Sequence, residues 1–472
     1  MNKKLIKNGT LVTSQKSFIA DLLIDGEKIA AIGTGLDAND AEVIDATGLL
    51  VLPGGVDPHV HLDLPMFGTV SSDDHYTGGK AAAFGGTTTL IDFVSHNEGS
   101  LEENITNWRK HAEQKASIDF GFHMNITRFN EQVAEELTTL SSHGVTSVKV
   151  FTAYNDRLRL ADGDIFKVMR IAGKHNLLTM VHAENGDIID ILVNEALTAH
   201  KTTPIWHART RPGWGEVEAS LRAVAMGAQA DAPVYLVHMN VGGEVDQLAY
   251  GRSKNVPVMG ETCPQYLFFT DHEYERPDGS KWVCSPPMRG FEDQTRLWQG
   301  LEDGTIQVLA TDHCPFFYDG THPILYEGKP IAIPGKELGK DDFTKIPNGL
   351  PGVGDRLPLF WNSAVNTGRI SPNHFVKLTA ENPARIFGLY PRKGSLLIGA
   401  DADLALWDPQ LEIEYGVKVA QHRTDYNLYE GTKLTGFPIQ VYQRGNLLVK
   451  NREWFGKQGM GRYLSRAAAE II

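Results

Sequence analysis

The feature that most constrains the fold of this chain is a regular alternation of short apolar runs and longer amphipathic segments. The runs are rich in β-branched residues, which favour strands, and they cover residues 55–60, 87–93, 119–124, 145–151, 177–182, 234–238, 256–261 and 306–312. Segments with helical periodicity, such as 101–116, 131–144 and 163–176, lie between them. Eight buried strands that alternate with helices predict a (β/α)8 TIM-like barrel of the α/β class. A doubly wound open sheet is the alternative, because periodicity cannot show that a sheet closes.

The two ends of the chain follow another pattern, that of short strands joined by tight turns. Residues 4–13 contain an Asn8-Gly9 pair and residues 20–33 an Asp25-Gly26 pair, which are typical of hairpins. Similar strands return at 401–409 and 438–454. Each end is small for a core of its own, although two independent β modules are the alternative to a joint domain.

The predicted domain organisation follows from these two patterns. We expect residues 1–52 and 387–455 to form one small, discontinuous β-sandwich domain, and residues 53–386 to form the barrel. Residues 456–472 are expected to be a C-terminal tail and a candidate contact between subunits. Residues 316–345 are long, irregular and rich in Gly and Pro, so we interpret them as a surface excursion, either a lid or a contact arm.

Composition excludes several classes of function. The chain has 45 Lys+Arg against 58 Asp+Glu, a formal net charge of −13, which argues against binding to nucleic acid. No apolar run is long enough to cross a membrane, so we expect a cytoplasmic protein. Cys263, Cys284 and Cys314 are too far apart for a disulfide framework or a cysteine-based zinc site, and we interpret them as inert packing residues.

Polar groups at the ends of several predicted strands indicate a metal site. His59 and His61 are two residues apart in a strand and therefore point to the same side. His182, His238 and Asp312 each end an apolar run. In a (β/α)8 barrel the carboxyl ends of the strands surround one cavity, where active sites are built, and imidazole and carboxylate groups are ligands of divalent ions. The pattern predicts that these side chains meet.

Lys149 stands in the middle of an apolar strand and needs its own explanation. An ammonium 4 Å from a divalent ion would be repelled by about 8 kcal/mol at an effective dielectric constant near 20. Lys149 must therefore be neutral, paired with an acid away from the metals, or converted by CO2 into a carbamate. The carbamate is anionic and could bridge two metal ions, so charge counting favours this conversion.

Several motifs, in order along the chain, resemble a known family. They are HVHLD (59–63), SVKVFTAY (147–154), VHAENGD (181–187), GETCPQYL (260–267), CSPPMR (284–289), TDHCPF (311–316), FTKIPNGLPGV (343–353), GSLLIGADADL (394–404) and GRYLSR (461–466). Together they resemble the cyclic amidohydrolases of the dihydropyrimidinase and D-hydantoinase group. The resemblance implies a barrel with a β-sandwich from both chain ends, a binuclear zinc site (with Mn²⁺ or Co²⁺ as alternatives) and a homotetramer, with a homodimer as the alternative.

Carried over position by position, the resemblance assigns six metal ligands. His59, His61 and Asp312 match the ligands of the more buried metal, His182 and His238 match those of the second metal, and Lys149 matches the carbamylated bridge (N6-carboxylysine). Tyr154 matches the tyrosine that polarises the scissile carbonyl. Ser285 and Asn348 match positions that bind the amide edge of the substrate, largely through backbone atoms.

The reaction that this resemblance implies is metal-assisted hydrolysis. A hydroxide between the two ions attacks a ring amide, and Asp312 moves the proton to the leaving nitrogen, so that a dihydropyrimidine or a 5-substituted hydantoin opens to an N-carbamoyl amino acid. Dihydroorotases typically carry Arg where this chain has Asp63, which cannot bind a carboxylate favourably, so we expect a small neutral substrate. Met239, Asn240 and residues 155–160 differ from common relatives and are expected at the pocket rim.

Three other functions are weighed against this one. Allantoinase or another cyclic ureide or imide hydrolase is the nearest alternative, but allantoinases commonly have Asn at the position of Asp63. A mononuclear deaminase would not need Lys149. A non-catalytic scaffold homologue would have lost metal ligands, whereas all six ligand positions are filled here.

Overall fold

A computed structural model describes residues 3–37, 40–66, 68–155 and 157–472 of the chain. Its centre is a sheet of eight parallel strands whose spatial order follows the chain. The strands are β6 (Gly55–Val60), β9 (Thr87–Val94), β10 (Asp119–Asn125), β11 (Ser147–Phe151), β12 (Leu178–His182), β13 (Val234–Leu236), β14 (Val258–Thr262) and β15 (Val308–Leu309). Each lies within one of the predicted runs or extends one residue beyond it, so the strand predictions are confirmed.

The first and last strands of this sheet meet, so the sheet closes into a barrel. A bridge joins Val60 to His313, and the amide of His61 donates to the carbonyl of His313 at 2.7 Å. The fully buried Arg356 also joins the first and last strands, because it donates to the carbonyls of Val56 in β6 and Leu309 in β15 at 2.9 and 2.8 Å. The (β/α)8 prediction is confirmed, and the doubly wound alternative is wrong.

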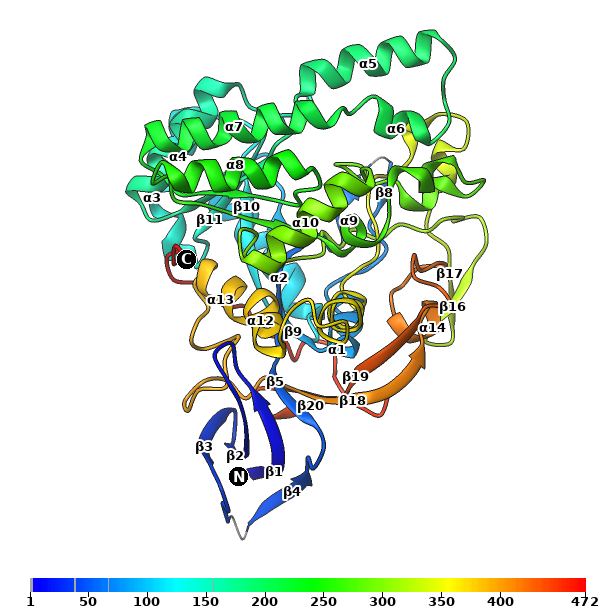
Figure 1. The fold of residues 1–472 in the computed structure, drawn as a ribbon. Helices are drawn as coiled ribbons and strands as arrows, with labels where there is room; N and C mark the ends of the chain where they lie inside the picture. The colour runs from blue at the N-terminus through cyan, green and yellow to red at the C-terminus, as the bar shows by residue number, and fades with distance from the viewer. Residues whose placement is uncertain (1–2, 38–39, 67, 156) are drawn as a thin grey trace.

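Helices separate the strands and cover the outside of the barrel (Figure 1). The longer ones are α1 (Thr77–Phe84), α2 (Leu101–Lys115), α3 (Glu131–Thr139), α4 (Asp162–Lys174), α5 (Gly186–Thr198), α7 (Gly213–Ala230), α8 (Gly242–Ser253) and α10 (Phe291–Asp303). Short helices are α6 (Ile205–Arg209), α9 (Pro264–Phe268), α11 (Arg356–Phe360), α12 (Pro372–Val376), α13 (Asn382–Ile386) and α14 (Val417–Ala420). Helix α2 begins at a capping box of Ser100 and Glu103, which satisfies two amides that a helix start leaves free. None of the described helices is long and apolar enough to span a bilayer.

Strands from both chain ends build a second sheet of nine strands. They are β1 (Lys3–Val12), β2 (Ser17–Asp25), β3 (Lys28–Gly33), β4 (Ala41–Asp45), β5 (Leu50–Pro53), β18 (Leu404–Glu414), β19 (Lys433–Gln443), β20 (Asn446–Lys450) and β21 (Glu453–Trp454). The ends meet where β5 pairs antiparallel with β18, so the alternative of two independent β modules is wrong. The Asp25-Gly26 turn is confirmed, but Asn8 and Gly9 lie at an irregularity inside β1 and not in a turn.

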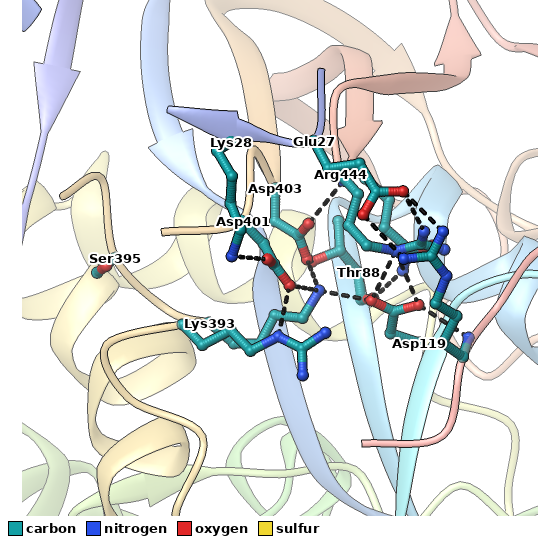
Figure 2. A network of polar contacts seen from close by, with 12 residues as sticks. Glu27, Lys28, Thr88, Asp119, Lys393, Ser395, Asp401, Asp403 and Arg444 are labelled. Carbon is teal, nitrogen blue, oxygen red and sulfur yellow. Dashed lines mark hydrogen bonds and ion pairs between the residues drawn. The ribbon is translucent and has the colours of Figure 1, made fainter. Parts of the chain in front are cut away.

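A buried network of charged side chains connects this sheet to the barrel (Figure 2). Lys393 donates to Asp119 of β10 at 2.6 Å and to Asp403 at 2.9 Å, and its amine lies 3.0 Å from Asp401. Arg444 also donates to Asp119 at 3.1 Å. The network lies at the amino end of β10, on the side of the barrel away from the carboxyl ends of the strands.

The C-terminal tail and the predicted excursion are held more firmly than the sequence indicated. Within the tail, the amide of Leu464 donates to Phe120 at 2.7 Å and the guanidinium of Arg466 to Ser147, so this stretch packs on the barrel of its own chain. In the excursion, the hairpin of β16 (Ile324–Tyr326) and β17 (Lys329–Ile331) is largely exposed, while Phe316, Phe317, Lys336 and Phe343 are buried. A purely surface excursion is therefore wrong for its two ends. The predicted domain boundaries stay a prediction.

Candidate functional site

A pocket of about 160 Å³ lies at the carboxyl ends of the barrel strands. Its lining includes eight of the nine predicted site residues, namely His61, Lys149, Tyr154, His182, His238, Ser285, Asp312 and Asn348. The ninth, His59, is fully buried behind His61, with their ring centroids 5.2 Å apart. Side chains that are up to 289 positions apart in the sequence, from His59 to Asn348, therefore meet around one cavity.

Two histidines and one carboxylate converge at the floor of this pocket. The Nε2 atoms of His59 and His61 each lie 3.2 Å from Oδ1 of Asp312, and ligand atoms of the three residues all lie within 4.8 Å of one another. Burial alone would raise the pKa of Asp312, but the adjacent His59 and His61 hold it well below its ordinary value. The carboxyl group is therefore an anion, and the donor set suits a divalent ion.

Lys149 projects from β11 into the same floor. Its side chain is buried, and Nζ donates to Nε2 of His59 at 3.0 Å and lies 4.3 Å from the centre of the Phe93 ring. Among the described residues no carboxylate lies within 4 Å of Nζ. The structure therefore does not show the alternative of a simple salt bridge to a neighbouring strand. Burial lowers the pKa of Lys149 to about 8.

A second pair of histidines lines the same pocket as Lys149. Nδ1 of His182 lies 2.9 Å from Nε2 of His238, and Nε2 of His182 lies 2.8 Å from Oε2 of Glu184. Burial holds the pKa of His238 well below its ordinary value, so its imidazole is neutral and free to bind a metal. The contact with Glu184 leaves Nδ1 as the ring nitrogen of His182 that is available to a metal ion.

Tyr154 lies on the loop that follows β11, beside the second histidine pair. Its ring centroid is 5.0 Å from that of His182, and burial raises the pKa of its hydroxyl above the ordinary value, so the group is a proton donor. Its φ of 64° is in the left-handed region, as are those of His238 (40°) and Asp312 (53°). Such conformations are unfavourable for bulky residues and cluster at functional sites.

Neighbouring contacts hold the loop of Tyr154 in this conformation. The amides of Arg157, Leu158 and Arg159 donate to the carbonyl of Tyr154 at 3.0–3.2 Å. Asn155 donates to Asp187 and Asp190 at the start of α5 at 3.1 and 2.8 Å. The loops after β11 and β12 are thereby joined, which fixes Tyr154 relative to His182.

Ser285 and Asn348 form one edge of the pocket and contact each other. Nδ2 of Asn348 donates to Oγ of Ser285 at 3.0 Å, and this hydroxyl also lies 3.3 Å from Nε2 of His207. Behind them the amide of Gly349 donates to the carbonyl of Val283 at 3.1 Å. The two loops therefore form a continuous polar edge that could orient a ring amide.

The structure corrects two expectations, one about the charge of Asp63 and one about the pocket rim. Asp63 is not part of the pocket lining. Its carboxylate accepts a hydrogen bond from Lys115 at 2.9 Å and contacts His111 at 2.7 Å. Its charge is therefore balanced outside the cavity and does not itself exclude an anionic substrate. Met239 and Asn240 are buried and are likewise not part of the lining, whereas Arg157 and Leu158 of the unusual loop are.

Two carboxylates that support the ligands were missed in the sequence. Glu261, at the end of β14, contacts Nδ1 of His59 and accepts from the hydroxyl of Tyr235 at 2.9 Å. It therefore leaves Nε2 of His59 available as a ligand atom, as Glu184 leaves Nδ1 of His182. The signal that could have revealed them is an acid at, or two residues beyond, the carboxyl end of a barrel strand, the edge at which the ligands also lie.

Residues 50–448 match the model of the amidohydrolase family. The chain belongs to this family. It is 45% identical over 468 residues to the D-hydantoinase of Geobacillus stearothermophilus (98% of this chain, 96% of the relative) and 40% identical to that of Streptomyces coelicolor (100% and 99%).

Solved structures agree with the family assignment. The crystal structure of dihydropyrimidinase from Brevibacillus agri NCHU1002 superimposes with a TM-score of 0.94 at 45% identity, and 99% of each chain is covered. The amidohydrolase chain described here thus shares both fold and length with the D-hydantoinase and dihydropyrimidinase group, as the motifs indicated.

Proposed function

We propose that this amidohydrolase opens the ring of 5,6-dihydropyrimidines, of 5-substituted hydantoins, or of both, to give N-carbamoyl amino acids. The observation that carries the proposal is the convergence of all nine predicted site residues on one pocket in a chain 45% identical to a D-hydantoinase. Apart from the histidines, the charged residues in the described lining are Lys149, Arg157 and Asp312, so most of the cavity suits a small neutral ring.

The metal-binding part of the proposal involves six residues. His59, His61 and Asp312 would hold one divalent ion, His182 and His238 a second, and Lys149 would bridge them as a carbamate. The fit rests on the donor set: imidazole nitrogens freed by Glu261 and Glu184, and an ionised Asp312. Zn²⁺ is the preferred ion for such nitrogen and oxygen ligands, with Mn²⁺ and Co²⁺ as alternatives. When bound, these ions would lower the pKa of water and stabilise developing negative charge.

The chain's own residues would perform the remaining chemistry. The protonated hydroxyl of Tyr154 would donate a hydrogen bond to the carbonyl oxygen as negative charge develops on it. Asp312, held as an anion, would accept a proton from the attacking water and deliver it to the departing ring nitrogen. Ser285 and Asn348 would orient the amide edge of the ring, so that the carbonyl lies against Tyr154.

The assembly and location of the protein are also proposals. We infer a homotetramer, supported by large apolar side chains on the surface such as Trp214, which is 83% exposed, and Phe291, which is 68% exposed. A cytoplasmic location is supported by three cysteines that are free and buried, a pattern typical of a reducing compartment. Residues 1–52 with 387–455 and residues 53–386 stay the proposed domains.

A hydrolysis panel tests the proposed function. Metal-loaded enzyme would be assayed with dihydrouracil, dihydrothymine, hydantoin, 5-phenylhydantoin, allantoin and dihydroorotate, with Asp312→Asn as the inactive control. Turnover is expected for at least one dihydropyrimidine or hydantoin and lost in the control. Turnover of allantoin or dihydroorotate alone would contradict the proposal, and turnover that persists in Asp312→Asn would contradict the assigned site.

A further inference from the structure

Lys336, in the otherwise irregular stretch between residues 316 and 345, is buried without a carboxylate partner. Its side chain is 1% exposed at the start of the 3-10 helix η4 (Lys336–Gly339). Nζ donates to the carbonyls of Val283 and Pro347 at 2.8 and 3.0 Å. No carboxylate among the described residues lies within salt-bridge distance of it, and burial lowers its pKa to about 7.

The two carbonyls that Lys336 binds belong to the loops that form the polar edge of the pocket. Val283 lies two residues before Ser285, and Pro347 directly precedes Asn348. The same loops contact each other through Gly349 and Val283 and through Asn348 and Ser285. A single amine, which is not part of the pocket lining, therefore ties the two loops together.

The position of Lys336 is itself fixed by the surrounding chain. Its amide donates to the carbonyl of Phe317 at 2.7 Å, and a side chain at Gly335 would come within 2.0 Å of that oxygen. Farther along, the amide of Phe343 donates to Thr202 at 3.0 Å. The backbone around Lys336 is thus held against buried structure, and it cannot move away from the two loops without breaking these contacts.

Packing alone does not explain a lysine at this place. Removing an amine from water costs free energy that an apolar side chain of similar volume would avoid. Two carbonyl acceptors recover part of this cost and, in return, set the distance between two backbone segments. The geometry is that of a fixed spacer.

We propose that Lys336 is a positioning residue for substrate binding: it sets the separation of the Ser285 and Asn348 loops and thereby the affinity for the amide edge of the cyclic substrate. The inference rests on the proposed function, because it assigns these loops to substrate. It gives the stretch from 316 to 345 a role as the support of one wall of the pocket.

Lys336→Met, which removes the donors and keeps most of the volume, tests the inference. We expect KM for the best substrate of the panel to rise about 10-fold while kcat changes less than about 3-fold, because binding to ground and transition states is weakened alike. Metal content should stay unchanged. Lys340→Met, at an exposed position of the same stretch, should leave both constants unchanged, and Lys336→Gln, which keeps a shorter donor, should raise KM about 3-fold.

A second measurement separates this inference from the proposed function. In Lys336→Met the amides of residues 283–285 and 348–350 should exchange with deuterium at least about 10-fold faster, while those around His59 and His182 keep wild-type rates. An unchanged KM together with unchanged exchange would overturn the inference. If no substrate of the panel is hydrolysed, the exchange rates alone decide the inference. If Lys336→Met does not fold, wild-type KM and wild-type exchange rates in Lys336→Gln would overturn the inference.

Discussion

Two buried lysines of this protein, Lys149 and Lys393, occupy opposite kinds of surroundings. Lys393 lies between the barrel and the β-sandwich, and its amine contacts three carboxylates, those of Asp119, Asp401 and Asp403, at 2.6–3.0 Å (Figure 2). Lys149 lies at the pocket floor against His59 and the faces of two phenylalanine rings. Both side chains are at most 2% exposed, so burial alone does not distinguish them.

The difference shows how neighbours decide what a buried lysine does. Around Lys393 the carboxylates overcome desolvation and raise the pKa, which keeps the amine charged. Around Lys149 desolvation dominates and lowers the pKa to about 8. A neutral amine has the free electron pair that reacts with CO2, whereas a charged amine does not. The comparison supports carbamylation at Lys149 and a structural role at Lys393.

The largest expected effect is that of Lys149→Ala on activity. Loss of the proposed bridge should lower kcat/KM by at least about 10³-fold, because residues that act as one unit fail together, and should reduce the metal content from two ions per chain. Short carboxylic acids should restore part of the activity by occupying the place of the carbamate. Steady-state kinetics and metal analysis would check this, and full activity of the variant would show that the bridge is wrongly assigned.

The next effect concerns stability, for which Lys393 is expected to matter more than Lys149. Lys393→Met should lower the free energy of unfolding by about 3–5 kcal/mol, because it leaves buried carboxylates without their partner. KM and metal content should stay close to wild type. Urea unfolding of Lys393→Met and Lys149→Met in the metal-free state is the measurement. If Lys149→Met proved the more destabilised of the two, the contrast between the two sites would be refuted.

The pH dependence of stability sharpens the same contrast. The pKa of Lys149 is 10.5 in the unfolded chain and about 8 in the folded one, so between these values the unfolded state binds more protons and stability rises with pH. The free energy of unfolding of metal-free Lys149→Met should therefore exceed that of wild type by about 3 kcal/mol near pH 7. This difference should disappear toward pH 10. For Lys393, whose pKa is raised, the stabilisation is present below pH 10.5 and is lost only at higher pH. A pH-independent gap in CO2-free buffer would contradict the assigned surroundings of Lys149.

The smallest predicted effect is that of Glu261→Gln. This change removes the anion that orients His59 but keeps the shape of the side chain, and outer ligand partners typically contribute about 10–100-fold to metal affinity. We expect a loss of this size in competition with a chelator. Glu273→Gln, at a position on the 3-10 helix η2 (Asp271–Glu275) away from the pocket lining, is the matched control and should bind metal like wild type.

Much of the fold and most of the site could be predicted from the sequence. The eight strands were recognisable because a parallel barrel buries its strands on both faces, which produces continuous apolar runs. His182 and Asp312 were recognisable because they end such runs. These are local signals, and the side chains lie close together because the carboxyl ends of the barrel strands surround one cavity.

The rest depends on contacts between distant segments, which a single sequence does not encode in a local pattern. Glu261 ends an apolar run, but only the structure shows its contact with His59. Asp63 lies next to the ligands in sequence but turns toward Lys115, so its charge was misjudged. Lys336 stands in an irregular stretch with no periodicity, and its two carbonyl partners are 53 and 11 residues away.

The central claim is that Lys149, which lies beside His59 with no carboxylate within 4 Å of its amine, is the lysine that CO2 converts, and carbon-13 NMR tests it most directly. Metal-loaded protein equilibrated with ¹³C-labelled bicarbonate should show one carbamate carbon signal in wild type and in Lys393→Met, and none in Lys149→Ala. A wild-type enzyme that is active with two metals and shows no carbamate signal would contradict the account. So would a signal that persists in Lys149→Ala.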